Sequence, residues 1–279
     1  MSLSSIKKIE NLFFVGYNKY DLAIYRIIYF CTMAYFFGYV KYFVGMNVLP
    51  QELWEPNGIL SIFQQTPISH DAFLLIFNIW IASLFFCIFG LFYKWTGPIC
   101  FILGSYIANQ GHSYGYQTHT FMPVFLALLP ICFSNASDAL SLDVLINKKK
   151  FNFIKNDEAE YSWPIRTVQL IFCLVFFSAG ISKLIHGGIE WITSDTLRNY
   201  FIRAHLFYFD VNSIASQLRI NEWFYQHERL CHIMALMTVV FELACIGAFF
   251  SKRLGKWIIP IVFLFQFGVF FTMYVNFIH

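Results

Sequence analysis

Residues 72–93 read AFLLIFNIWIASLFFCIFGLFY, a run of apolar and aromatic side chains without a single charge. A helix that crosses the hydrocarbon core of a bilayer needs about 20 such residues. The whole chain shares this character, because 58% of its 279 residues are hydrophobic, 21% are aromatic and only 13% are charged. A soluble globular domain carries about 25% charged residues. The composition therefore predicts an integral membrane protein and excludes a soluble fold.

Apolar runs recur along the chain and predict an all-α bundle of about seven membrane-spanning helices, forming a single domain over residues 1–279. The predicted spans lie near residues 21–44, 72–93, 97–110, 118–133, 163–185, 230–250 and 256–277. A polar break, Asn109–Thr120, separates the short third and fourth spans. In the long loop 186–229, segments 196–209 and 213–225 mix apolar, aromatic and basic residues, which predicts short helices at the membrane surface.

The lysines and arginines predict the orientation of the bundle, since they concentrate in the loops on the cytoplasmic side. With the N-terminus inside, most of them fall in inside segments, including the cluster Lys148–Lys150. Merging the third and fourth spans into one would place this cluster outside. We therefore expect seven spans, with the N-terminus inside and the C-terminus outside. The net charge of +3 gives no argument for nucleic acid as a partner.

Cysteine and histidine spacing gives little support for a metal site. The seven cysteines lie in or beside apolar runs and show no CxxC spacing, so we expect small buried side chains rather than a disulfide framework or zinc site. His112 and His119, seven residues apart, are a weak pattern for metal ligands. We expect no metal.

Charged residues inside predicted spans are costly, so each is a candidate for function. Glu242 lies near the middle of the sixth span and must be protonated or paired inside the bundle, either as a structural hydrogen bond or as part of a site. Arg26, in the first span, favours a structural role. Lys183, near the outer end of the fifth span, has two interpretations: its ammonium extends to the lipid headgroups, or it is held on a protein-facing surface where a lysine can act as a base.

The surroundings of Lys183 support the second interpretation. Polar and small residues recur at alternating spacings of three and four, and so share one face of the fifth span: Arg166, Gln169, Cys173, Phe176, Gly180 and Lys183. Small residues in this helix allow a neighbouring helix to approach closely. The polar break lies on the outside in the predicted topology, at the same side as Lys183. We therefore expect His112 and Lys183 to meet in a cavity that opens outward.

Three motifs carry a resemblance to a known family: His112-Ser113-Tyr114-x-Tyr116, then Ser141-Leu142-Asp143, then Ala179-Gly180-Ile181-Ser182-Lys183-Leu184 with Trp191 downstream. In order and spacing they resemble the vitamin K-dependent γ-carboxylase family. More broadly the chain resembles the HTTM (horizontally transferred transmembrane) domain proteins, whose bacterial members include SdpB-like proteins of antimicrobial-peptide systems. The resemblance covers most of the chain, from the first span to the last.

The resemblance implies specific roles. Lys183 matches the carboxylase lysine that deprotonates a reduced quinone of the vitamin K or menaquinol type, and His112 matches a histidine that assists it. Tyr114, Tyr116 and Trp191 are then expected to line the cofactor site, together with Gln266, the nearest candidate for a late carboxylase histidine. Arg26, Arg166 and Glu242 are expected to be structural polar groups. A bacterial plasma membrane, a secreted peptide and membrane lipids are the implied setting and partners.

Three departures limit the resemblance. Gly111 stands where the carboxylase has an asparagine, Gln266 stands in place of its late histidine, and we expect no large luminal domain after the seventh span, because the chain ends at His279. A separate outer-domain subunit is then a further expected partner. Two functions stay open: a carboxylase-like or peptide-modifying enzyme with Lys183 as base, and a non-catalytic SdpB-like accessory factor for a secreted antimicrobial peptide. A transporter is disfavoured, because the chain shows no internal repeat.

Overall fold

The computed structural model describes residues 10, 12–14, 16–39, 49–115, 122–146, 158–207 and 220–273. Every regular element within these ranges is a helix, which confirms the all-α prediction. Three of the described helices are long and apolar enough to cross a membrane: α4 (His70–Phe89), α8 (Glu158–Gly187) and α13 (Glu228–Phe250). The full set of seven spans and the orientation of the termini stay predictions.

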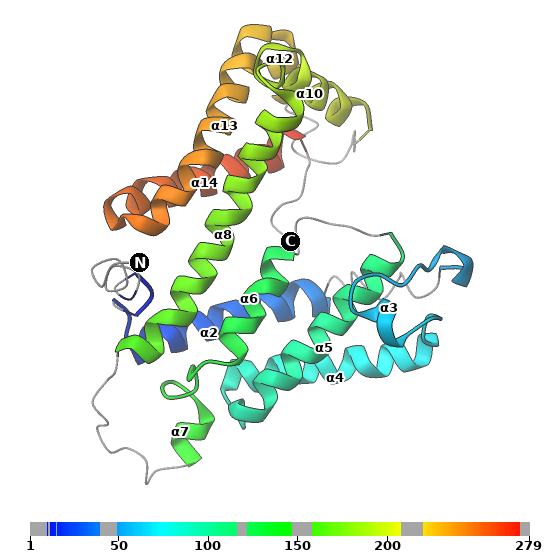
Figure 1. Ribbon diagram of the computed structural model, residues 1–279, viewed down its shortest axis with the longest axis vertical. Coiled ribbons are helices and arrows are strands. Elements are labelled where there is room, and N and C mark those ends of the chain that lie inside the picture. The colour runs from blue at the N-terminus through cyan, green and yellow to red at the C-terminus, as the bar shows by residue number, and fades with distance from the viewer. Residues whose placement is uncertain are drawn as a thin grey trace. The chain divides into compact units, whose positions relative to one another are not determined.

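The chain forms two compact units, Met1–Val168 and Gln169–His279, and α8 runs from the first into the second. Besides α4 and the first part of α8, the first unit contains α2 (Lys19–Met33), the π-helix η1 (Ala34–Tyr39), the short 3-10 helix η3 (Gln51–Leu53), α3 (Leu60–Phe63), α5 (Tyr93–Ser113), α6 (Met122–Cys132) and α7 (Leu142–Ile146) (Figure 1).

Aromatic side chains fill the core of the first unit, where α2, α4, α5 and α6 pack together. Trp80 of α4 is fully buried, and its ring centroid lies 5.5 Å from that of Phe37 and 6.0 Å from that of Phe125. On α5, Gly104 makes room for this indole, because a β-carbon there would lie 2.8 Å from Trp80 Nε1. Large rings beside a small residue allow the helices to approach closely, as expected for a bundle in lipid.

Arg26 ties one end of this unit together. Its guanidinium is fully buried and donates to the carbonyl oxygens of Ala136 at 2.8 Å, Leu140 at 2.6 Å and Ile88 at 3.4 Å. Gly90, which has a φ of 61°, ends α4 beside this guanidinium. A β-carbon at position 90 would lie 2.6 Å from the guanidinium, so this position requires a residue without a side chain. Arg26 thus binds backbone carbonyl groups from two other segments of the first unit.

The Ser141-Leu142-Asp143 motif belongs to the same region. Both carboxylate oxygens of Asp143 accept backbone hydrogen bonds at the start of α5, from Phe92 N at 2.8 Å and Tyr93 N at 2.9 Å. Ser141 Oγ donates to the Ser137 carbonyl and accepts from Val144 N. A carboxylate at a helix N-terminus accepts hydrogen bonds from free N–H groups, and its negative charge interacts favourably with the helix dipole. In this chain the motif therefore holds helices together.

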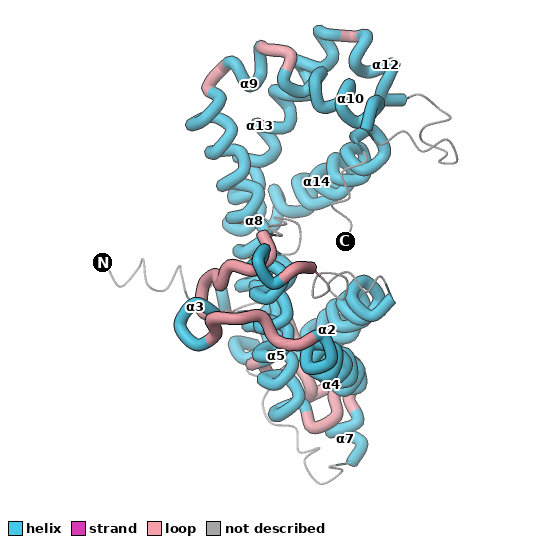
Figure 2. The backbone as a smooth tube through the Cα atoms, turned by 90° about the vertical axis from the view of Figure 1, so that its right-hand side faces the viewer, coloured by secondary structure: helices cyan, strands magenta, loops and turns pink. Residues whose placement is uncertain are grey.

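The second unit contains α9 (Glu190–Thr193), α10 (Thr196–Phe207), α12 (Ile220–Gln226), α13 and α14 (Lys252–Met273), and the last part of α8 (Figure 2). A small core joins the short helices to α13: Leu197, Phe201, Cys231 and Ala235 are buried, and the rings of Phe201 and Phe224 stack at 5.2 Å. Short helices in the predicted outer loop are thus present, with α10 and α12 in the two segments that the sequence indicated.

Two predicted boundaries were wrong. Helix α4 ends at Phe89 rather than near residue 93, because Gly90 takes a left-handed conformation and reverses the chain. The predicted break began at Asn109, but α5 continues through Ser113. Its polar side chains bond the helix itself, Asn109 Nδ2 to Ser105 O at 2.8 Å and Ser113 Oγ to Asn109 O at 3.0 Å. Residues 116–121 and the end of the first predicted span, 40–44, lie outside the described residues.

Candidate functional site

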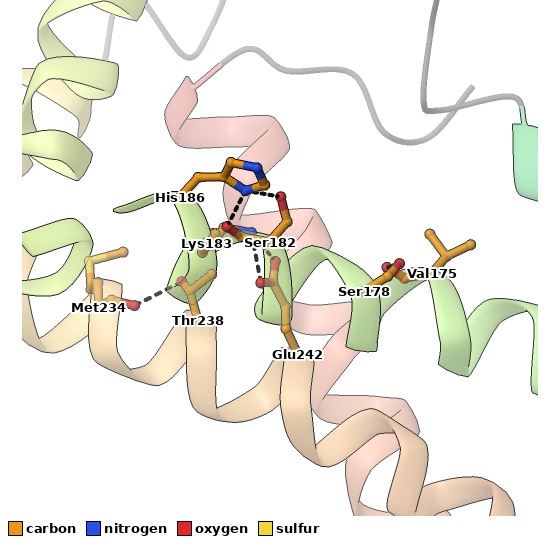
Figure 3. Close-up of polar contacts among 8 residues, drawn as sticks. All are labelled: Val175, Ser178, Ser182, Lys183, His186, Met234, Thr238 and Glu242. Atoms are coloured by element: carbon orange, nitrogen blue, oxygen red, sulfur yellow. Dashed lines mark hydrogen bonds and ion pairs between the residues drawn. The ribbon is translucent and has the colours of Figure 1, made fainter. Parts of the chain in front are cut away.

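Lys183 of α8 and Glu242 of α13 form an ion pair within the second unit. The Nζ of Lys183 lies 2.7 Å from both carboxylate oxygens of Glu242. Figure 3 draws the two side chains and the contacts between them. The side chain of Lys183 is 23% exposed and that of Glu242 only 9%. Glu242 is therefore the more buried side chain of the two, and Lys183 is partly exposed. Neither interpretation of Lys183 from the sequence anticipated that its ammonium is held by Glu242.

Small residues on α8 explain why the two helices approach at this point. A β-carbon on Gly180 would lie 3.0 Å from the β-carbon of Glu242 and 3.2 Å from the side chain of Leu243, so only glycine fits without displacing α13. Gly180 and Lys183 are three residues apart and share a face. The polar and small stripe of α8 thus faces protein here, as its spacing predicts.

Two further groups surround Lys183. The indole of Trp191 lies with its ring centroid 5.3 Å from Nζ, a cation–π contact that stabilises the ammonium. One turn further along α8, His186 Nδ1 contacts the carbonyl oxygen of Ser182 at 2.9 Å and its hydroxyl at 3.3 Å (Figure 3). Lys183 therefore has a buried carboxylate on one side, an aromatic face on another, and an exposed imidazole on the next turn of its helix.

His112 lies in the first unit, at the wall of a separate cavity of about 350 Å³. The cavity is lined by Leu53, Glu55, Pro56, Asn57, His112, Ser113, Tyr114 and Gly115. Backbone hydrogen bonds hold its two sides together, since Glu55 N donates to Ser113 O at 2.8 Å and Asn57 N donates to Ser113 Oγ at 3.2 Å. The cavity thus forms where the loop before α3 packs against the end of α5.

Partial burial alters the titration of two groups at this cavity, both beyond the predicted span 97–110. Desolvation lowers the pKa of His112 below its ordinary value, because burial disfavours the imidazolium. The same cause raises the pKa of Tyr114, since its phenolate would lose hydration. At neutral pH His112 is therefore a neutral imidazole, able to accept a proton at one nitrogen and donate from the other.

The other residues predicted for the site fall in different places. Arg166 is buried, and its Nε donates to Leu12 O at 2.7 Å, so it holds the segment before α2 within the first unit. Tyr116 lies outside the described residues, and Gln266 lies on α14 without a described side chain. His112 belongs to the first unit and Lys183 to the second. Their predicted meeting in one cavity stays a prediction.

Sequence reasoning missed several members of these sites. Glu55 and Asn57, on either side of Pro56, were not singled out, yet both line the His112 cavity. Glu242 was singled out as buried but not matched to Lys183. A lone carboxylate in one apolar helix and a lone amine in another each cost free energy unless they are paired. This cost is the sequence signal that could have matched Glu242 to Lys183.

Only helices among the regular elements of the described residues, three of them long and apolar, together with a lysine–glutamate pair between two of these, define an integral membrane protein of the helical-bundle class. The chain belongs to the HTTM domain family, whose profile matches residues 16–275. Comparison with curated proteins and with solved structures gave no match.

Proposed function

We propose that this HTTM protein is a carboxylase-like membrane enzyme in which Lys183 acts as a base toward a weakly acidic hydroxyl, such as that of a reduced quinone. The observation that carries the proposal is the contact of Lys183 Nζ with both oxygens of Glu242 at 2.7 Å, with Lys183 the more exposed side chain of the two. Burying the charge of Lys183 costs desolvation free energy, and the opposite charge of Glu242 offsets that cost. The pair can therefore keep a lysine inside the membrane region.

The pair can share one proton between its two partners. With the proton on Nζ, an ammonium faces a carboxylate; with the proton on an oxygen of Glu242, a neutral amine faces a neutral carboxyl group. A surrounding of low dielectric constant reduces the preference for separated charges. The neutral amine of Lys183 has a free electron pair and can accept a proton from a hydroxyl group. Glu242 then serves as the store for the proton that Lys183 carried before.

The residues around Lys183 suit a quinone-type cofactor. When bound, a reduced quinone supplies hydroxyl protons and two electrons. Trp191 offers an aromatic face 5.3 Å from Nζ, against which a flat ring can stack. Lys183 would hold a hydroxyl of the ring by a hydrogen bond from or to Nζ. The cavity at His112, with Tyr114 and Asn57, is a second and independent candidate for binding a polar group. The setting that we propose is a bacterial plasma membrane, with a secreted peptide as substrate.

The test uses the protein in lipid nanodiscs with a reduced vitamin K-type quinone and oxygen. The measurements are the rate of quinol oxidation and the mass of co-purified lipids. We expect Lys183→Met to lower the rate about 100-fold, in the range for removal of a general base. His186→Gln, which changes an exposed neighbour outside the ion pair, is the matched control and keeps the rate. If the protein oxidises the quinol no faster than empty nanodiscs, and no quinone co-purifies, the proposal fails.

The contact between Lys183 and Glu242 also favours a second function, in which the ion pair serves only to link two helices. Lys183 Nζ bonds both oxygens of Glu242, so the pair is suited to lock α8 against α13. The chain would then be an SdpB-like accessory factor for a secreted antimicrobial peptide, without chemistry of its own. The double variant Lys183→Met/Glu242→Leu distinguishes the two, since it replaces the ion pair by apolar contact. An accessory factor keeps its function in this variant, whereas an enzyme loses it while staying folded.

A further inference from the structure

Three side chains with metal-binding atoms gather at one place in the second unit. Asp195 lies directly before α10, while Glu228 and His232 lie on the first turns of α13. Each offers one ligand atom, and these atoms all lie within 4.8 Å of one another. Glu228 and His232 are four residues apart and so share one face of the helix. The group is separate from the Lys183–Glu242 pair, which is formed further along α13.

We propose that Asp195, Glu228 and His232 bind a divalent transition-metal ion of the zinc class. Two carboxylate oxygens and one imidazole nitrogen form a ligand set that zinc accepts, with water completing the fourth position. Bonds of about 2.0–2.2 Å at tetrahedral angles separate neighbouring ligand atoms by roughly 3.4 Å, so rotation of exposed side chains closes the site. Calcium is disfavoured because it takes six to eight oxygen ligands, and copper(I) because it prefers sulfur.

The neighbours of the three residues agree with this assignment. Among the described residues, no hydrogen bond engages either ring nitrogen of His232, so the imidazole is available as a ligand. Arg198 contacts one oxygen of Asp195, Oδ1, at 3.3 Å and is itself held by the Tyr225 carbonyl at 2.9 Å. This contact orients the carboxylate and leaves its second oxygen for a metal. Two carboxyl groups, Asp195 and Glu228, stand against the single guanidinium of Arg198, which favours a cation.

The nearby thiol does not belong to the ligand set. Cys231 is buried and its Sγ donates to the carbonyl oxygen of Phe224 at 3.3 Å, within the core that α10 and α12 share with α13. A bound ion would instead connect the turn before α10 directly to the first turn of α13. It would therefore close the loop that carries α10 and α12, and fix these short helices to the long apolar helix. Cysteine and histidine spacing gave no indication of metal because the ligands come from two distant segments.

The experiment measures zinc binding by the full-length protein in detergent, after treatment with EDTA and removal of the chelator. Zinc content after gel filtration and titration calorimetry give the stoichiometry and affinity, and circular dichroism gives the melting temperature. The variants are His232→Gln and Asp195→Asn. His70→Gln, an exposed histidine at the start of α4, is the matched control. We expect the unaltered protein and the control to bind one equivalent of zinc and to melt at a higher temperature with it.

Both variants should lose this equivalent, or bind it at least about tenfold more weakly. Their melting temperatures without zinc should equal that of the metal-free protein, which shows that the variants fold. Retention of the full stoichiometry and affinity by either variant overturns the three-ligand site. Failure of the unaltered protein to bind zinc more tightly than a simple surface histidine also overturns it. None of these outcomes depends on whether Lys183 is catalytic, so the proposed function can fail independently.

Discussion

The Nζ of Lys183 lies 2.7 Å from both carboxylate oxygens of Glu242, although 59 residues separate them in the chain. The contact joins the end of α8 to the middle of α13 and places opposite charges where a lipid-facing helix would carry none. The contribution of this ion pair to the free energy of unfolding can be measured separately from any activity.

The first prediction concerns the energy of this pair. Lys183→Met leaves the Glu242 carboxylate buried without its partner and should cost on the order of 2–4 kcal/mol of unfolding free energy. Lys183→Met/Glu242→Leu should recover most of that loss, because no charge is then left buried. The measurement is a double-variant cycle of unfolding in detergent. A loss in the double variant equal to the sum of the losses in Lys183→Met and Glu242→Leu would show that the charges do not interact.

The second prediction concerns the close approach of α8 and α13. Gly180→Leu places side-chain atoms where Glu242 and Leu243 already lie, and should destabilise the second unit by about 1–3 kcal/mol. Gly268→Leu on α14 is the control, because a β-carbon there meets no described atom within 4 Å. The melting temperatures of the two variants give the comparison. Similar melting temperatures would mean that the helices separate without cost.

The third prediction concerns Arg26. Arg26→Met removes the donors to the carbonyls of Ala136, Leu140 and Ile88 and should cost on the order of 3 kcal/mol, because buried acceptors lose their partners. Arg26→Lys should be intermediate, since an ammonium cannot reach all three carbonyls from one position. Ile24→Ala, at an exposed position of the same helix, is the control. Chemical unfolding followed by circular dichroism measures the order; a milder effect of methionine than of lysine would contradict it.

The fourth prediction concerns pH. Burial lowers the pKa of His112 in the folded protein, whereas in the unfolded chain the imidazole titrates near 6.5. The unfolded chain therefore binds more protons as the pH falls through about 6.5, and the stabilisation from a neutral folded imidazole is lost from there down to the lower folded pKa. Stability should thus rise with pH across this window. His112→Gln should flatten this part of the profile, measured as melting temperature against pH; an unchanged slope would exclude His112 as its source.

Much of the fold follows from local pattern. The uncharged run at residues 72–93 predicted α4, and the spacing from Arg166 to Lys183 predicted which face of α8 meets protein. Helix ends were less predictable. The end of α4 depends on Gly90, which must be left-handed and without a side chain because Arg26 and Ser141 occupy that space. Those neighbours come from distant segments, and a local pattern does not show them.

Lys183 and Glu242 were predictable one by one but not as a pair. Lys183 and Glu242 were each recognised as costly inside a membrane, yet which residue of α13 faces Lys183 depends on the packing of two helices. The Ser141-Leu142-Asp143 motif shows the opposite case. Resemblance directed attention to it, and the contacts of Asp143 with Phe92 N and Tyr93 N assign it to helix capping. Asp195, Glu228 and His232 approach one another only after the outer loop folds.

Trp191 gives the chain an optical probe beside Lys183. The emission of an indole responds to the electric field across its ring, and the ring of Trp191 lies 5.3 Å from Lys183 Nζ. Loss of the positive charge on Nζ changes that field strongly at so short a distance. The difference in emission between the protein and its Trp191→Phe variant therefore follows the proton on Lys183 in real time, without a label, while the protein stays in its membrane.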